Sequence, residues 1–269
     1  MTVKLLIIDP QNDFCDIPGA ALPVPGASAD LARLAGFIRA AGPRLTDLGV
    51  TLDSHPHVAI ERVSFWQDDT GGPIAPFTVV TEAGVRAREF SPRDPARLPE
   101  VLEYLHALEE RGRYKLMVWP VHCVIGTWGH NLYAPLAAQM AAWEERTQKP
   151  ILTVLKGLNP MTEQYSAVRA EVPRADDERT MTHRGLVGWV RPGNGWVLTA
   201  GEASSHCVRA TWLDLMEYLS PEESTRVVFL TDCMSPVAGC EAAANDFLKQ
   251  VSARGARTVT SAEALRLIA

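Results

Sequence analysis

The fold class follows from the stretch Val3-Lys4-Leu5-Leu6-Ile7-Ile8-Asp9, a short apolar run that ends in a carboxylate. Such a run is typical of a strand that is buried on both faces of a parallel sheet. A helical pattern follows at residues 29–41, and a second short strand at 50–52 runs into Asp53. Strand and helix therefore alternate from the start, which predicts a parallel sheet with helices on both faces.

The same alternation continues along the rest of the chain. Four more apolar runs are interpreted as strands, at 115–119, 151–155, 196–200 and 226–230. Helical patterns lie between these strands or beside them, at 96–111, 134–146, 206–219 and 239–253. We therefore expect a three-layer α/β/α fold around a six-stranded, mainly parallel sheet.

One segment interrupts this rhythm. Residues 66–95 contain several glycines and prolines and show no clear periodicity. We interpret them as an insertion that forms a lid or a subunit contact, and we expect a single domain over residues 1–269. The apolar helices and the insertion also favour a homo-oligomer, although the sequence does not define its interface.

Composition excludes several classes of partner. Lys and Arg number 26 against 32 Asp and Glu, so the net charge is -6, and the sequence lacks the basic character of a nucleic-acid-binding protein. No apolar run approaches the length of about 18 residues that a membrane span needs, and no signal-peptide core is present. We expect a cytoplasmic protein without nucleic-acid or membrane partners. Its five cysteines are expected to be free thiols.

Three residues at predicted strand ends and helix starts favour acyl-transfer chemistry. Cys207 follows a strand and begins a helix, where the helix dipole lowers a thiol pKa and free N–H groups can bind an oxyanion. Asp9 and Lys156 end two other strands. Taken singly, the three could be a buried apolar thiol, a helix cap and a surface lysine. If they are adjacent, they form a nucleophile, a base and an electrostatic stabiliser.

A second group has the character of a metal site. Asp53 and His55 are two residues apart at a strand end, so their side chains point to one side, and His122 follows another strand. Oxygen and imidazole ligands suit zinc or another first-row divalent metal, and three protein ligands leave room for water or substrate. The alternative is that both histidines make ordinary hydrogen bonds. His57 and Glu61 are further candidate ligands.

Five segments, in this order, resemble those of the isochorismatase-like cysteine hydrolases, and within that superfamily those of the nicotinamidases. They are Asp9-Pro10-Gln11-Asn12-Asp13-Phe14, Asp53-Ser54-His55-Pro56, Trp119-Pro120-Val121-His122-Cys123-Val124, Leu155-Lys156-Gly157 and Ser205-His206-Cys207-Val208. With the elements around them they cover residues 3 to about 250. The Asp-x-His and Trp-Pro-x-His pair favours a nicotinamidase-like amidase, because other branches of the superfamily generally lack it.

The resemblance implies roles for these residues. The catalytic triad would be Asp9, Lys156 and Cys207, and the metal ligands would be Asp53, His55 and His122. The implied activity is hydrolysis of nicotinamide, or a related small amide, to the acid and ammonia through a thioester. The implied cofactor is a divalent metal, with zinc favoured over manganese or iron.

The resemblance also implies the walls of the substrate pocket. Phe14, Trp119 and Tyr165 resemble the aromatic residues that flank the substrate ring in the family. A cis peptide bond is expected between residues 202 and 203, so that the backbone amides of Ala203 and Cys207 face the oxyanion.

The sequence departs from the family pattern in two places. The segment from Asp53 to Phe65 is longer than usual, and Glu61 or Arg62 stands where a histidine is common, so the fourth metal ligand is Glu61, His57 or water. The stretches 66–95 and 158–194 are also long and could reshape the pocket. The alternatives are therefore an amidase for a carbamoyl or maleamate-like compound, a metal-water hydrolase in which Cys207 is passive, and a non-catalytic binding protein.

Overall fold

The computed structural model describes residues 1–269, and its centre is a six-stranded sheet in which every pairing is parallel. The strand order is β10-β9-β8-β1-β2-β7. The strands are β1 (Val3–Ile8), β2 (Asp47–Asp53), β7 (Leu152–Lys156), β8 (Trp196–Gly201), β9 (Val227–Leu230) and β10 (Arg257–Val259). The predicted fold class is confirmed.

One strand was assigned to the wrong sheet. The run at 115–119 forms β6 (Leu116–Val118), but β6 pairs antiparallel with β4 (Thr78–Val80), outside the central sheet. The sixth strand of the central sheet is β10, which lies at its edge. β10 was missed because it is only three residues long and two of them are exposed, so it has no apolar run.

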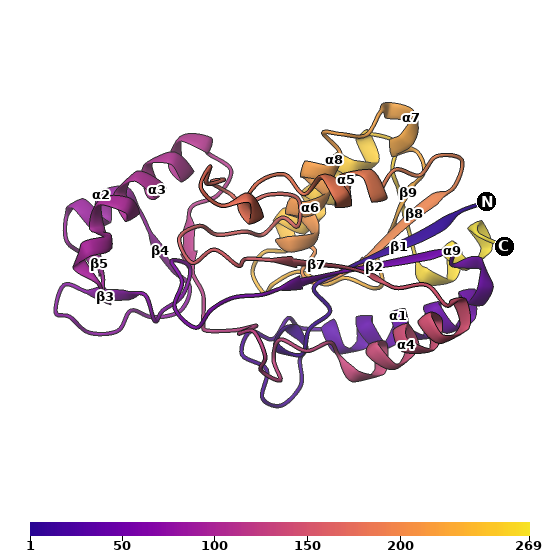
Figure 1. The fold of residues 1–269 in the computed structure, drawn as a ribbon, viewed down its shortest axis with the longest axis horizontal. Coiled ribbons are helices and arrows are strands. Elements are labelled where there is room, and N and C mark those ends of the chain that lie inside the picture. The colour runs from indigo at the N-terminus through magenta and orange to yellow at the C-terminus, as the bar shows by residue number, and fades with distance from the viewer.

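Helices cover both faces of the sheet and make the three layers (Figure 1). One face packs against α1 (Ala27–Ala41), α4 (Ala134–Thr147) and α9 (Ser261–Leu267). The other face packs against α5 (Arg184–Trp189), α6 (Cys207–Leu215) and α8 (Glu241–Ala253), and α7 (Pro221–Ser224) lies at its margin. Short 3-10 helices occur at Asn12–Phe14, Gly42–Arg44, Pro95–Arg97 and Glu178–Thr180. No helix combines the length and apolar character needed to cross a bilayer.

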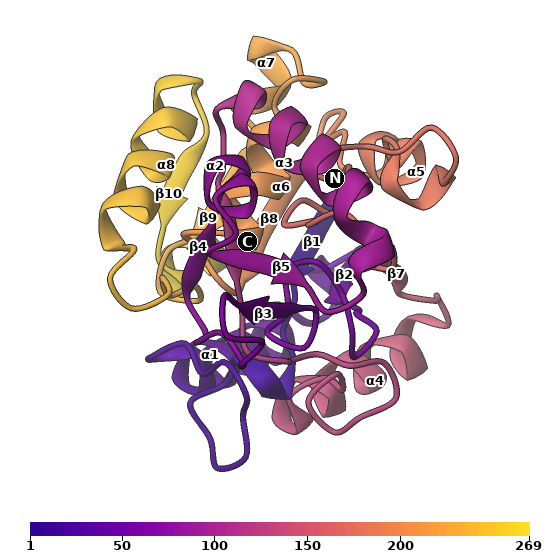
Figure 2. The same ribbon diagram turned by 90° about the vertical axis from the view of Figure 1, so that its left-hand side faces the viewer.

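Residues 66–118 form a lobe beyond one end of the sheet (Figures 1 and 2). The lobe contains β3 (Trp66–Asp68), β4, α2 (Glu82–Arg86), β5 (Phe90–Pro92), α3 (Leu98–Arg111) and β6. β3 pairs with β5, and the lobe has a hydrophobic cluster of its own that includes Trp66 and Leu105. The segment 66–95 is therefore not structureless, although its strands are too short to show a periodic pattern.

The carboxyl ends of four adjacent strands meet at the edge of the sheet nearest the lobe. β1 lies between β8 and β2, and β2 pairs with β7 so that Asp53 is opposite Lys156. Asp9 directly follows β1, and α6 begins at Cys207 shortly after β8. Parallel strands thus bring residues that are far apart in the sequence to one edge, where ligands bind in sheets of this kind.

Candidate active site

Lys156 lies at the centre of the site and joins the three predicted catalytic residues. Its Nζ atom is 3.0 Å from Oδ2 of Asp9, 3.4 Å from Sγ of Cys207 and 2.7 Å from Oδ1 of Asp53. The lysine is buried, which disfavours its charge, but the two carboxylates outweigh burial and raise its pKa well above the ordinary value. Lys156 is therefore a fixed cation. We call the part of the pocket formed by Asp9, Lys156 and Cys207 the triad end.

Asp9 is held in an unusual backbone conformation. Its φ of 43° lies in the left-handed region, which residues other than glycine rarely occupy. Thr51 on the neighbouring β2 stabilises it, because the Thr51 hydroxyl donates to Oδ1 at 2.5 Å and the Asp9 N–H donates to the Thr51 carbonyl. Burial raises the pKa of Asp9, although the nearby Lys156 opposes this shift. A raised pKa suits a carboxylate that must accept and return a proton.

Cys207 is a neutral thiol in the resting site. Burial raises its pKa well above the ordinary value, although Lys156 opposes this shift, and Asp9 raises the pKa further. The expectation of a lowered pKa was therefore wrong: Cys207 does begin α6, but its burial outweighs the helix terminus. A buried neutral thiol needs an adjacent base before it can attack, and Asp9 contacts the same Lys156 ammonium as the thiol.

The loop before Cys207 leaves two backbone amides free. The Glu202–Ala203 peptide bond is cis, as the resemblance implied. Neither the Ala203 N–H nor the Cys207 N–H donates a hydrogen bond within the chain. Gly201 permits the tight approach of this loop to β1, because a Cβ atom there would lie 2.0 Å from the Ile8 carbonyl oxygen. Both amides are therefore available to bind an oxygen atom next to the thiol.

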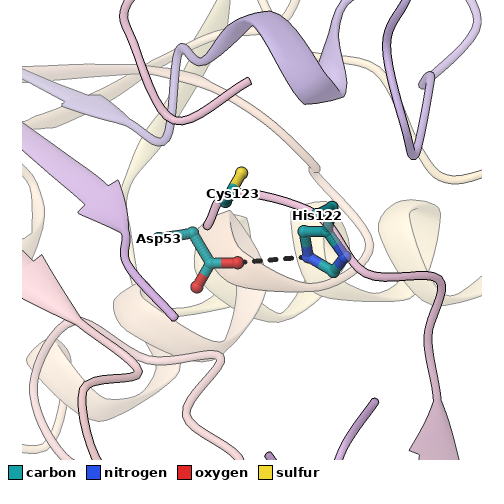
Figure 3. A group of neighbouring side chains, drawn as sticks. All are labelled: Asp53, His122 and Cys123. Carbon is teal, nitrogen blue, oxygen red and sulfur yellow. Dashed lines mark ion pairs between the residues drawn. The ribbon is translucent and has the colours of Figure 1, made fainter. Parts of the chain in front are cut away.

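The three predicted metal ligands also meet, around the carboxylate of Asp53. Oδ1 of Asp53 is 2.8 Å from Nε2 of His55. Figure 3 shows the ion pair on the other side of the carboxylate, where Oδ2 is 3.2 Å from Nε2 of His122. Cys123, which sequence reasoning did not consider as a ligand, lies beside Asp53 and His122, and potential ligand atoms of these three residues lie within 4.8 Å of one another. We call the region of Asp53, His55 and His122 the metal end.

Two donors at the metal end, Asp53 and His122, have the ionisation state that a divalent metal needs, whereas, against burial, Asp53 and Glu61 raise the pKa of His55. Burial opposes ionisation of Asp53, but His55 and Lys156 outweigh it and hold its pKa well below the ordinary value. Burial lowers the pKa of His122 to about 4, so its imidazole is neutral, as a metal ligand must be. The Nδ1 atom of His122 faces the Pro120 carbonyl oxygen at 2.8 Å, so Nε2, which Nη1 of Arg62 approaches at 3.1 Å, would be the nitrogen that binds a metal.

The candidates for a fourth ligand differ in position. Oε1 of Glu61 is 2.9 Å from Nδ1 of His55, the nitrogen that faces away from Asp53, so Glu61 orients the imidazole from behind. His57 is exposed and does not line the pocket. Gly157 packs against the other side of His55, where a Cβ atom would lie 2.3 Å from the ring. Neither Glu61 nor His57 is placed as a fourth ligand.

Arg62 occupies the position next to His122. It is fully buried, and its Nη1 atom lies 3.1 Å from Nε2 of His122, contacts Nδ1 of the same ring, and donates to the Pro120 carbonyl oxygen at 3.2 Å. Backbone pairing with Trp119 fixes its place in the loop. Sequence reasoning noted Arg62 only as a departure from the family pattern and did not place it in the pocket.

The triad end and the metal end form two ends of one pocket. The predicted aromatic residues Phe14, Trp119 and Tyr165 all line it, and Nε1 of Trp119 donates to the Tyr165 hydroxyl at 3.1 Å. His206 and Glu163 also line the pocket and were not predicted. His206 stands next to Cys207 in the sequence, and this was the available signal for it.

No family model and no curated protein matches the chain. Solved structures do match it over almost its whole length. The yeast nicotinamidase structure has a TM-score of 0.67 at 21% identity and covers 96% of this chain and 99% of its own. The pyrazinamidase of Pyrococcus horikoshii, solved in complex with zinc, has a TM-score of 0.54 at 21% identity, with 97% and 99% covered.

An isochorismatase family protein from Desulfovibrio vulgaris has a TM-score of 0.54 at 19% identity, and the match covers 99% of this chain and 98% of that one. Sequence identities this low establish a shared architecture, while function has to be argued from the site. The chain therefore has the isochorismatase-like fold found in the nicotinamidases.

Proposed function

We propose that the protein is a cysteine amidohydrolase that hydrolyses nicotinamide, or a related small flat amide, to the acid and ammonia. The observation that carries the proposal is the contact of one buried ammonium, that of Lys156, with both the Asp9 carboxylate and the Cys207 sulfur. These groups open onto a pocket with aromatic walls that suit a planar substrate.

In the first half of the reaction, Asp9 takes the thiol proton of Cys207 while the sulfur attacks the carbonyl carbon of the amide. The free N–H groups of Ala203 and Cys207 bind the oxyanion, and loss of one such donor typically costs about 10²–10³ in rate. Asp9 then gives its proton to the leaving nitrogen, so that ammonia departs and a thioester remains. Lys156 keeps its proton throughout and stabilises the Asp9 carboxylate.

In the second half, Asp9 takes a proton from water, and the water oxygen attacks the thioester carbonyl. The C–S bond breaks, and Asp9 returns the proton to the Cys207 sulfur. The carboxylic acid is released, and the site returns to its starting protonation state. The raised pKa of Asp9 suits both directions of proton transfer.

Asp53, His55 and His122 would hold a divalent metal, with zinc favoured over manganese and iron. When bound, such an ion supplies a Lewis acid that orients the substrate through its ring nitrogen or through a water molecule beside it. The zinc complex of the Pyrococcus horikoshii pyrazinamidase supports this part of the proposal.

The test is ammonia release from nicotinamide by the purified protein, with Cys207→Ala as the inactive variant and Cys240→Ala as its matched control. Cys240 is a free thiol at the start of α8 and does not line the pocket. We expect release by the wild type and by Cys240→Ala, and none by Cys207→Ala. Full activity of Cys207→Ala would instead support a metal-water hydrolase with a passive thiol. Ammonia release only from a carbamoyl or maleamate-like amide would assign a different substrate to the enzyme and leave the proposed thiol chemistry unchanged.

A further inference from the structure

We infer that Arg62 binds a carboxylate on the substrate, so that the pocket selects a flat amide that carries an anionic group at the end away from the scissile bond. The inference rests on the proposed amidohydrolase function and names its substrate class. It starts from Arg62 itself, a fully buried arginine in the wall of the pocket.

The guanidinium of Arg62 is only partly satisfied by the protein. Nη1 has the Pro120 carbonyl and the His122 ring as partners, but Nη2 and Nε have no hydrogen-bond partner. Buried donors are almost always paired, and an unpaired donor on a charged group is costly. A guanidinium that is held at a pocket wall with unused donors is therefore suited to an acceptor that arrives with a ligand.

The nearby carboxylates do not pair the free donors of Arg62. Oε1 of Glu61 is 3.4 Å from Nε of Arg62, but the same oxygen is 2.9 Å from His55, and it does not reach Nη2. Glu163 also lines the pocket, and burial raises its pKa to about 7, so it is largely uncharged in slightly acidic solution. Asp53 is shared between the two imidazoles and Lys156.

The position of Arg62 sets where the anionic group of the substrate would lie. Contacts lead from Cys207 to Lys156, from Lys156 to Asp53, and from Asp53 to His122, which Arg62 touches. Lys156, Asp53 and His122 thus connect the thiol to the guanidinium, and Trp119 and Tyr165 also line the cavity. A planar substrate can place its amide at Cys207 and a planar carboxylate against the fork of donors on Arg62.

The experiment compares two substrates that differ only in the carboxylate, 3-carbamoylbenzoate and benzamide. The kcat and KM values are measured for the wild type, Arg62→Gln, Arg62→Lys and a control, Arg209→Gln. Arg209 is a nearby cation that donates to the Tyr114 hydroxyl at 2.8 Å and does not line the pocket. The metal content of every variant is measured alongside.

We expect the wild type to have a KM for 3-carbamoylbenzoate at least about tenfold below its KM for benzamide, since hydrogen bonds to charged groups are the stronger ones. Arg62→Gln should raise the KM of the anionic substrate by about tenfold or more, with a much smaller change for benzamide. The KM of Arg62→Lys for the anionic substrate should lie between those of the wild type and Arg62→Gln, because lysine keeps the charge but lacks the planar fork of donors. Arg209→Gln should behave as the wild type.

Two results would overturn the inference while the proposed function stands. One is equal KM values for both amides in the wild type. The other is a loss in Arg62→Gln that is the same for both amides or that follows a fall in metal content, since Arg62 would then only support the site. If the wild type hydrolyses no amide, the proposed function fails, and calorimetry with isophthalate decides the inference separately. Binding of isophthalate to the wild type that is lost in Arg62→Gln would support the inference. Absence of isophthalate binding to the wild type would overturn it.

Discussion

The two ends of the pocket differ in how their buried charged groups are paired. At the triad end, Oδ2 of Asp9 has no hydrogen-bond partner but lies 3.0 Å from the Lys156 ammonium, and Thr51 donates to Oδ1. At the metal end, buried oxygen and nitrogen atoms of Glu61 and Arg62 have no hydrogen-bond partner. The difference teaches that one cation of the chain neutralises the Asp9 carboxylate at the triad end, whereas the metal end keeps several unpaired buried donors and acceptors that a bound group can pair.

Lys156 is the one group that belongs to both ends. Its Nζ atom is 2.7 Å from Asp53 of the metal end and 3.0 Å from Asp9 of the triad end. If the ends are distinct, removing Lys156 should damage both, and removing a residue from one end should spare the other. The following experiments test that division.

Lys156→Met should have the largest effect. It leaves the buried carboxylates of Asp9 and Asp53 without their shared cation, and breaking a buried ion pair in this way costs about 3–5 kcal/mol. We expect no measurable ammonia release and a free energy of unfolding in urea that is lower by that amount. Lys149→Met is the control, because Lys149 is exposed and its pair with Asp47 is worth less than about 1 kcal/mol. Unchanged stability of Lys156→Met would contradict the central role of this lysine.

His122→Ala should damage the metal end alone. The variant loses an imidazole donor beside Asp53, so we expect the purified protein to bind no metal and its activity to fall by at least the roughly 10–100-fold that loss of a hydrogen-bond partner of a metal ligand costs. The rate at which iodoacetamide alkylates Cys207 should stay at the wild-type value. His57→Ala, which removes an exposed histidine, is the control. Stoichiometric metal with normal affinity in His122→Ala would show that His122 is not a ligand.

The pH dependence of kcat/KM should report the triad end. Burial raises the pKa of Asp9 above 3.8, and the base must be ionised to accept the thiol proton, so activity is lost as pH falls through the raised pKa. Thr51→Val removes a hydrogen bond that favours the ionised form, and should move the acid limb to higher pH. An acid limb at the same pH in both proteins would show that Asp9 is not the group observed.

Arg62→His should have the smallest effect and sharpen the description of the metal end. The change removes a buried cation from the side of His122 and offers an imidazole in its place. We expect zinc affinity to rise by about tenfold, measured by competition with a chromophoric chelator. Arg209→His controls for the loss of a nearby cation outside the pocket. Equal zinc affinity in Arg62→His and the wild type would mean that Arg62 does not limit the metal end.

The triad end was largely predictable from the sequence. Asp9 and Lys156 each stand at the end of an apolar run, and parallel strands place such residues at one edge. Cys207 was recognisable because a helix begins there. The protonation state of the thiol was not predictable, since it depends on the depth of burial, which only the packing of the surrounding segments sets.

The metal end was predicted only in part. Asp53 and His55 lie at the end of a strand, so the strand pattern predicted their positions. Arg62 lies in a loop, and the sequence of a loop has no periodicity from which its course could be predicted. An arginine is normally exposed, so its complete burial could not be anticipated from its residue type. Similarly, the run at 115–119 predicted a strand but carried no information on which sheet the strand would join.

The separate core of the lobe has a consequence for the motions of the protein. Trp66 and Leu105 belong to a buried cluster distinct from the two clusters on the faces of the sheet. Such a unit can open while the remainder stays folded, and its amide hydrogens then exchange with solvent at a rate set by local opening. We expect α3 amides to exchange faster than those of β1, as deuterium uptake would show. Since β6 leads directly into Trp119, each opening of the lobe would also loosen one wall of the pocket.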